Sequence, residues 1–184
     1  MSAIFHSAIF ETPLATVGAV WSQGLLRRIL LGDSGRGALE TRLAAAFPGL
    51  QAGTPPEAAA FAAALDAYLA RRQDFKLPLK SLDLEQLSPP FRARVLLALK
   101  TVPLGRVVSY GQLASLSGRP GTARAVGSAM ANNPFPLLFP CHRVALGGGG
   151  PGEFGPGRGM KLALLRHEGV VPDADGRLPR AFFL

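Results

Sequence analysis

The chain has 184 residues, of which 48% are hydrophobic and 17% are charged, a balance that excludes a disordered protein. Its formal charge is +8, and most of its 20 basic residues are arginine. Arginine-rich chains bind phosphate groups well, but a GC-rich genome produces the same bias, so charge alone leaves nucleic-acid binding open. One cysteine excludes an internal disulfide. With no signal-peptide pattern and no apolar run of about 18 residues, we expect a soluble, cytoplasmic protein.

The first part of the chain predicts a small mixed domain. The apolar runs "TVGAVW" and "LLRRILLG" are separated by Ser22-Gln23-Gly24, which is typical of a hairpin. The alanine-rich ranges 36–47 and 56–72 have the apolar spacing of helices, and 75–84 is predicted to be extended.

A composition change near 84–90 predicts a domain boundary. Ser88-Pro89-Pro90 is followed by an apolar helical pattern that begins at Phe91, and proline in the first turn is a favoured position. We expect an N-terminal domain at 1–85, a second domain at 86–175 and a tail at 176–184.

The range 109–131 predicts two short helices joined by a turn. Ser109 is a candidate N-cap for the first helix, and Gly118 ends it. This geometry is typical of a helix-turn-helix, although many helical hairpins bind nothing. The second helix carries one long side chain, Arg124, among small residues, so it can closely approach either a protein core or a nucleic-acid groove. The small residues are Ala123, Ala125, Gly127, Ser128 and Ala129.

The only cysteine, Cys141, lies within "FPCHRV". It is either a small buried apolar residue or a nucleophile. The apolar range 134–140 is predicted to be buried and extended and to end at this cysteine. A thiol with a reference pKa of about 8.5 needs a base or a cation nearby. His142 is adjacent, and Glu168, at the end of a helix predicted over 159–169, is the carboxylate best placed to orient that ring.

Four segments in order, "SYGQLA", "ARAVGSAMANNP", "PCHRV" and "KLALLRHEG", resemble the O6-alkylguanine-DNA alkyltransferases, or methylated-DNA–protein-cysteine methyltransferases. The resemblance covers about half of the chain, from Phe91 to Gly169, while the first 85 residues resemble the family's variable N-terminal domain more loosely. It implies an α+β fold: a small N-terminal α/β domain with a short antiparallel sheet, then a mainly helical C-terminal domain with a helix-turn-helix and an active-site strand or loop.

The resemblance also implies roles for individual residues. Cys141 would accept the alkyl group, with His142, reached through a water, and Glu168 completing a proton relay. Asn133 would hold the turn that brackets the site. Tyr110 would lie beside a flipped nucleotide and protonate the departing guanine.

DNA contacts and a base pocket follow from the same resemblance. Arg124 would enter the base stack while its helix lies in the minor groove. The other expected DNA contacts are Tyr110, Ala123, Ala125, Gly127 and Arg119. The expected base pocket consists of Met130, Pro136, Val144, Phe154 and Gly155.

The implied function is direct reversal of DNA damage. The alkyl group of O6-alkylguanine, with O4-alkylthymine as a second candidate substrate, would move irreversibly to Cys141, once per molecule. The alternatives are a non-enzymatic helix-turn-helix damage sensor or regulator, and a cysteine hydrolase. We expect double-stranded DNA carrying alkylated guanine as the partner, a monomer without a protein partner or membrane contact, and no cofactor. The three histidines and one cysteine show no metal-ligand spacing, so we expect no zinc.

The glycine-rich range 147–159, called the lip below, would border the base pocket. The family usually has tyrosine where Phe154 stands and often a small polar residue where Gly155 stands. Because glycine raises the entropy of an open loop, we expect a roomy, mobile lip that accepts alkyl groups larger than methyl. The alternative is that Pro151 and Pro156 keep the lip rigid.

Overall fold

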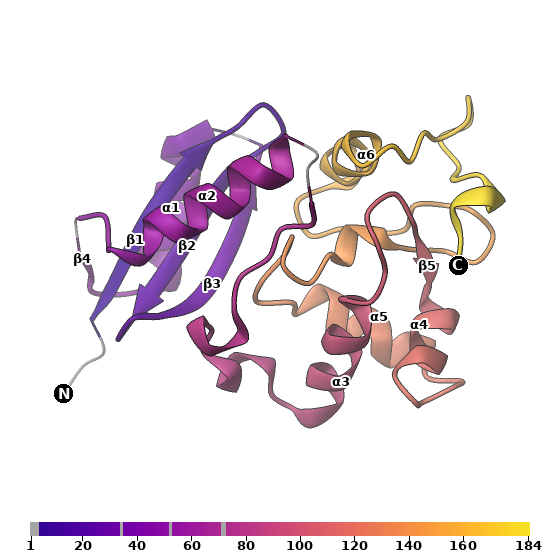
Figure 1. Ribbon diagram of the computed structural model, residues 1–184, viewed down its shortest axis with the longest axis horizontal. Coiled ribbons are helices and arrows are strands. Elements are labelled where there is room, and N and C mark those ends of the chain that lie inside the picture. Colours follow the sequence, from indigo (N-terminus) through magenta and orange to yellow (C-terminus); the bar gives the residue numbers. More distant parts are fainter. Residues whose placement is uncertain (1–3, 34, 52, 71–72) are drawn as a thin grey trace. The chain divides into compact units, whose positions relative to one another are not determined.

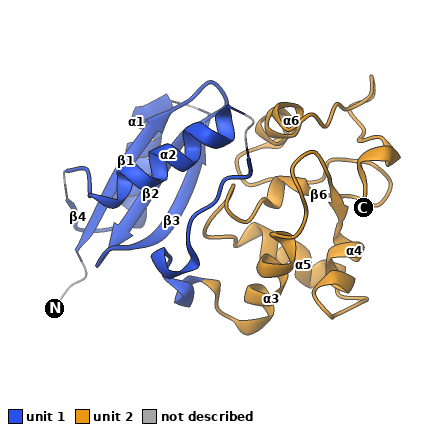
Figure 2. Ribbon diagram, viewed as in Figure 1, with its two compact units in different colours: residues 1–86 blue, residues 87–184 orange. Residues whose placement is uncertain are grey.

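The structure, a computed structural model, describes residues 4–33, 35–51, 53–70 and 73–184. The chain forms two compact units, Met1–Gln86 and Leu87–Leu184 (Figure 2). The division lies next to the boundary expected from the sequence, but residues 176–184, expected as a tail, belong to the second unit. No helix formed by the described residues has the length and hydropathy needed to cross a membrane.

Unit 1 is built on a four-stranded sheet with the order β3-β2-β1-β4 (Figure 1). Strands β1 (Phe5–Glu11), β2 (Thr16–Ser22) and β3 (Leu25–Gly32) are antiparallel, and β4 (Leu50–Gln51) is parallel to β1. The predicted hairpin is present between β2 and β3. Its turn residues, Gln23 and Gly24, have positive φ angles, which glycine adopts readily.

Two helices, α1 (Gly35–Ala46) and α2 (Glu57–Leu69), cover opposite faces of this sheet. Side chains alternate along β2, so Gly18 faces α1, where an added Cβ would lie 3.1 Å from Leu39. Trp21 faces the other side and makes an edge contact with Phe61 of α2, with ring centroids 5.6 Å apart. The connection to unit 2 contains two 3-10 turns, η1 (Leu79–Ser81) and η2 (Leu84–Leu87). The prediction that 75–84 is extended was therefore wrong at η1 and at Leu84, the first residue of η2.

Unit 2 is mainly helical, with α3 (Pro90–Leu99), α4 (Tyr110–Leu116), α5 (Ala123–Ala131) and α6 (Arg158–His167). Strands β5 (Val108–Ser109) and β6 (Val144–Ala145) form a short parallel pair. Two 3-10 turns, η3 (Cys141–Arg143) and η4 (Arg180–Phe182), complete the unit. The predicted α+β class is confirmed, and α4 and α5 form the predicted pair of helices around a turn.

Residues 134–140 are not extended, contrary to the prediction. Asn133 Oδ1 accepts from the Phe135 amide at 3.0 Å, and Asn133 Nδ2 donates to the Phe139 carbonyl at 2.7 Å. The Phe139 amide donates to the Phe135 carbonyl at 2.9 Å, and Leu137 has a φ of 70°. The asparagine side chain thus closes a turn, because it supplies both a donor and an acceptor to the backbone.

Candidate active site

Cys141 is the first residue of η3 and not the end of a strand, and it lines a cavity of about 290 Å³. Its amide donates to the Phe139 carbonyl at 2.7 Å, which ties it directly to the turn closed by Asn133. The cysteine is 7% exposed. The cavity is lined by Tyr110, Gly127, Met130, Ala131, Cys141, Glu153, Phe154 and Gly155.

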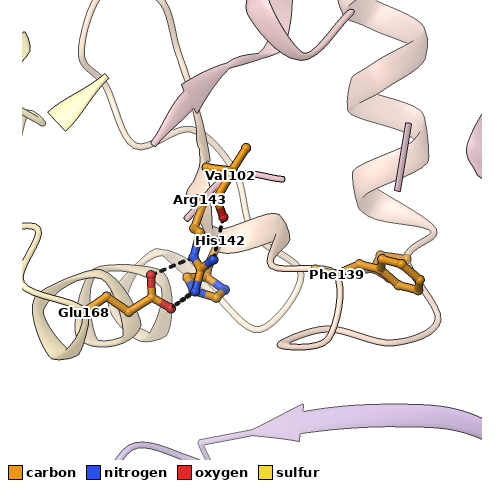
Figure 3. A network of polar contacts seen from close by, with 6 residues as sticks. Val102, Phe139, His142, Arg143 and Glu168 are labelled. Atoms are coloured by element: carbon orange, nitrogen blue, oxygen red, sulfur yellow. Dashed lines mark hydrogen bonds and ion pairs between the residues drawn. The ribbon is translucent and has the colours of Figure 1, made fainter. Parts of the chain in front are cut away.

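A buried polar network lies directly after the cysteine (Figure 3). His142 Nε2 is 2.8 Å from Glu168 Oε1. Arg143 donates from Nε to Glu168 Oε2 at 2.8 Å and from Nη2 to Oε1 at 2.9 Å, and its Nη1 donates to the Val102 carbonyl at 2.7 Å. Glu168 is the C-cap residue of α6, so the end of this helix delivers the carboxylate to η3. The structure thus brings together the predicted His142 and Glu168 and adds Arg143.

The network fixes the charge and tautomer of His142. Burial alone would raise the pKa of Glu168, but the His142 ring and the Arg143 guanidinium lower it below its usual range. Burial lowers the pKa of His142 despite the opposing effect of Glu168, so the ring is neutral at pH 7. An ionised carboxylate only accepts hydrogen bonds, so Nε2 carries the ring proton. The buried Nδ1 is then a free acceptor, with no hydrogen-bond partner among the described residues.

Lys161 is a buried cation near the thiol. It is 0% exposed, and its Nζ donates to the Val144 carbonyl at 2.6 Å and to the Glu153 carbonyl at 3.3 Å. Burial lowers the pKa of Lys161 to about 8, against the opposing charges of Cys141 and Glu153. Burial likewise raises the pKa of Cys141, whereas the Asn133 side chain and the Lys161 charge lower it. Lys161 therefore favours the thiolate of Cys141 electrostatically.

Tyr110, the first residue of α4, lines the cavity together with Cys141. The preceding Ser109 and Gln112 form a capping box: Gln112 N donates to Ser109 Oγ at 3.1 Å, and Ser109 N donates to Gln112 Oε1 at 2.9 Å. Burial, with smaller effects from Cys141 and Glu153, raises the pKa of Tyr110. Its hydroxyl therefore stays protonated at neutral pH and can donate a proton or a hydrogen bond.

An open groove of about 510 Å³ adjoins the cavity and shares Tyr110 and Gly127 with it. Arg124 of α5 is exposed and lines this groove, and an added Cβ at Gly127 would lie 3.9 Å from the Tyr110 ring. The groove is lined by Ser109, Tyr110, Gly111, Ala123, Arg124, Gly127, Leu146 and Gly147. The predicted DNA contacts Ala123, Arg124 and Gly127 therefore share one surface, while Ala125 and Arg119 are exposed outside its lining.

The predicted base pocket is only partly assembled around the cavity. Met130, Phe154 and Gly155 line it, and Lys161 Nζ lies 6.0 Å from the centroid of the Phe154 ring. Pro136 and Val144 are not part of the lining; Val144 is 0% exposed and takes part through its carbonyl, which accepts from Lys161.

Two residues of the site were missed in the sequence, Arg143 and Lys161. The sequence around each of them nevertheless indicates a buried, partnered side chain. Arg143 follows a histidine within an otherwise apolar segment, and Lys161 lies on the face of α6 that buries Met160 and Leu164, where a lysine is unusual unless its amine has a partner. Among the described residues, no three His, Cys, Asp or Glu side chains form a group that could hold a metal ion.

The fold and the site together define a protein with a pair of helices around a turn and a buried cysteine that opens into a cavity beside them. The family "6-O-methylguanine DNA methyltransferase, DNA binding domain" matches residues 90–170. The Mycobacterium leprae (strain TN) methylated-DNA–protein-cysteine methyltransferase is 42% identical over 116 residues, which cover 61% of this chain and 68% of that protein. The chain therefore belongs to the methylated-DNA–protein-cysteine methyltransferase family.

Two further comparisons show how much of the chain is shared. The Cricetulus griseus member is 55% identical over 73 residues, which are 39% of this chain and 35% of that protein, so the match spans about a third of this relative. The crystal structure of Mycobacterium tuberculosis OGT in complex with DNA has a TM-score of 0.72 and 28% identity, and covers 91% of this chain and 96% of that one.

Proposed function

We propose that the protein repairs DNA by moving the alkyl group from O6 of an alkylated guanine to Sγ of its own Cys141. The observation that carries this proposal is the position of the thiol. Cys141 borders the cavity of about 290 Å³ together with Tyr110, a proton donor, and is followed directly by His142, whose buried Nδ1 is a free acceptor. A nucleophile, a base and an acid are thus gathered in one site.

In the proposed reaction, Cys141 loses a proton, His142 accepts one and Tyr110 donates one. The thiol proton moves through a bridging water to His142 Nδ1, which makes no direct hydrogen bond to the described residues, and Glu168 stabilises the resulting imidazolium through its bond to Nε2. The thiolate then attacks the alkyl carbon, so that the S–C bond forms as the C–O6 bond breaks. The departing guanine keeps the electron pair and takes a proton from the Tyr110 hydroxyl. The proton held by His142 returns to the tyrosinate through solvent, which restores neutrality.

The product is a thioether at Cys141, and water does not hydrolyse a thioether as it hydrolyses an acyl-enzyme. None of the groups that line the cavity can remove the alkyl group again. We therefore propose one transfer per molecule, with the protein consumed by the reaction.

The proposed partner is double-stranded DNA that carries alkylated guanine. O6 of a stacked guanine is out of reach, so the base must leave the helix at a cost of a few kcal/mol. The groove beside the cavity presents Arg124 on a helix of small residues, which suits entry into the minor groove and filling of the vacated stack. The net charge of +8 and the DNA-bound structure of M. tuberculosis OGT support DNA binding. We further propose a cytoplasmic monomer.

Intact-protein mass spectrometry tests this proposal. The protein is incubated with duplex DNA that contains a single O6-methylguanine, and with the same duplex containing guanine. We expect a gain of one methyl group on the peptide that contains Cys141, only with the methylated duplex, and no gain in Cys141→Ser. A wild-type protein that binds the duplex and gains no mass would instead be a DNA-binding regulator, and the proposal would fail.

A further inference from the structure

Residues 173–184 hold two different walls of the cavity. The segment begins with a turn closed by Asp173, whose amide donates to the Arg177 carbonyl at 2.8 Å and whose Oδ1 accepts from the Arg177 amide at 2.8 Å. Leu178 follows and is 3% exposed, in an apolar cluster with Val107 and Leu165. The expected tail is therefore an ordered part of unit 2, fixed by a turn at one end and by apolar burial in its middle.

The first wall is the lip. The Leu178 amide donates to the Gly149 carbonyl at 2.7 Å, and the Arg177 guanidinium donates to the Gly148 carbonyl. Gly149 has a φ of 89°, and an added Cβ would lie 3.1 Å from the Leu178 carbonyl oxygen, so glycine permits this close approach. The same part of the lip forms its own turn, in which the Leu146 amide donates to the Gly150 carbonyl at 2.8 Å.

The second wall is the one that carries Tyr110. The Val107 amide donates to the Phe182 carbonyl at 2.9 Å, and the Leu184 amide donates to the Val107 carbonyl at 3.1 Å. The Leu184 carbonyl also accepts from the side chain of Gln112. Gln112 forms the capping box with Ser109, the residue directly before Tyr110. The segment therefore anchors the start of α4 as well as the beginning of the lip.

We propose that residues 173–184 form a clasp that sets the aperture of the base cavity and so limits the size of the alkyl group that the site accepts. Gly152, Phe154 and Gly155 continue the lip from the clasped turn, and an added Cβ at Gly152 would lie 3.3 Å from the Tyr110 hydroxyl. A shift of the clasped turn therefore changes the gap between the lip and Tyr110. This inference rests on the proposed alkyl transfer and concerns its specificity.

The clasp modifies the expectation of a mobile lip. The glycines alone suggest a loop that opens freely, but the carbonyls of Gly148 and Gly149 are held from outside, and Lys161 holds the Glu153 carbonyl from inside. The mobility of the lip is then limited by its hydrogen bonds to Arg177, Leu178 and Lys161 and is not set by its glycine content alone. Arg177 is the accessible contact to remove, because it is exposed and bonds the lip through its side chain.

The experiment compares two pairs of variants. Arg177→Ala removes the side-chain bond to Gly148, and its control is Arg180→Ala, an exposed arginine of the same segment whose guanidinium lies over Phe183. Gly149→Ala places a Cβ against Leu178, and its control is Gly49→Ala, at a glycine of unit 1 that also has a positive φ, 85°, but nothing within 4 Å. Transfer rates are measured on duplexes with O6-methylguanine and O6-benzylguanine, and the benzyl-to-methyl ratio cancels differences in DNA binding.

We expect this ratio to rise about fivefold in Arg177→Ala or Gly149→Ala, the factor that corresponds to one lost hydrogen bond, and to stay at the wild-type value in both controls. Amide hydrogen exchange at Leu178, which needs no substrate, should become faster in Arg177→Ala and in Gly149→Ala and should stay unchanged in the two controls. Ratios within twofold of wild type in both test variants would overturn the clasp. A wild-type protein that transfers no alkyl group at all would instead overturn the proposed function, and the exchange rates would still decide whether the clasp holds the lip.

Discussion

The carboxylate of Glu168 accepts hydrogen bonds from both His142 and Arg143. His142 Nε2 lies 2.8 Å from Oε1, and Arg143 Nε lies 2.8 Å from Oε2. One buried anion thereby fixes the tautomer of the proposed base and compensates a buried guanidinium. The two functions cannot be separated by a single substitution at Glu168.

Replacing Glu168 with Gln should lower the free energy of unfolding at pH 7 by about 3–5 kcal/mol, because Arg143 is left as an uncompensated buried charge. The His142 and Arg143 contacts lower the pKa of Glu168, so its contribution is complete above the unfolded-state pKa of about 4.3 and is lost as the pH falls below it. Urea unfolding at pH 7 and pH 3 should show the gap between wild type and variant narrowing in acid. Glu85→Gln, at an exposed position, is the control, and an unchanged gap would contradict the assignment.

Arg124→Ala should slow repair of O6-methylguanine in duplex DNA but leave reaction with free O6-benzylguanine close to wild type. The free base needs no flipping, so it bypasses the step in which Arg124 would fill the stack. Arg119→Ala is the contrasting variant: it should weaken DNA binding and reduce the slope of log affinity against log salt by about one, as for a phosphate contact. Equal losses on both substrates in Arg124→Ala would show that Arg124 supports the fold.

Lys161→Met should reduce the rate with free O6-benzylguanine at pH 7 by about tenfold, because the Lys161 charge lowers the pKa of the Cys141 thiol and its loss leaves less thiolate. The rate should recover at higher pH, as the thiol of the variant ionises. Lys76→Met, at an exposed position, should react like wild type. A rate that stays low at every pH would mean that Lys161 acts only by holding Val144 and the lip in place.

The same lysine predicts a pH dependence of stability. Burial lowers the pKa of Lys161 to about 8, so between about 8 and the unfolded value of about 10.4 the folded protein binds fewer protons than the unfolded chain. The stability of the wild type relative to Lys161→Met should therefore rise with pH across this window. Cys141 and Tyr110, whose pKa values are raised, act in the opposite direction, but they are present in both proteins. Thermal unfolding of both proteins from pH 7.5 to 10.5 measures it.

The sequence predicted the elements whose signals are local. The hairpin turn at Gln23-Gly24, the cap at Ser109 and the stop at Gly118 each depend on residues next to one another, and all three are present in the structure. Strand β1 was not predicted, because its residues alternate poorly and it is stabilised by pairing with β2, which single-sequence patterns do not reveal.

Only part of the site could be predicted from the sequence, because local motifs are visible there and long-range contacts are not. Cys141 and His142 are adjacent in sequence, and the motif around them is specific, whereas Arg143 and Lys161 acquire their roles from partners that only folding brings near. The apolar character of 134–140 predicts an extended segment, but the side chain of Asn133 closes it into a turn. A long-range contact such as that of Leu178 with Gly149 has no local signal, so residues 176–184 have the sequence pattern of a tail although they contact the lip.

The central claim is that the alkyl group stays on Cys141. Excess duplex DNA with a single O6-methylguanine is added to a known amount of protein, and restored guanine is counted until the reaction stops. We expect one guanine restored per protein molecule, matched by one methylated Cys141, with no further product on longer incubation. More than one guanine per protein molecule would contradict irreversible transfer and show an enzyme that turns over.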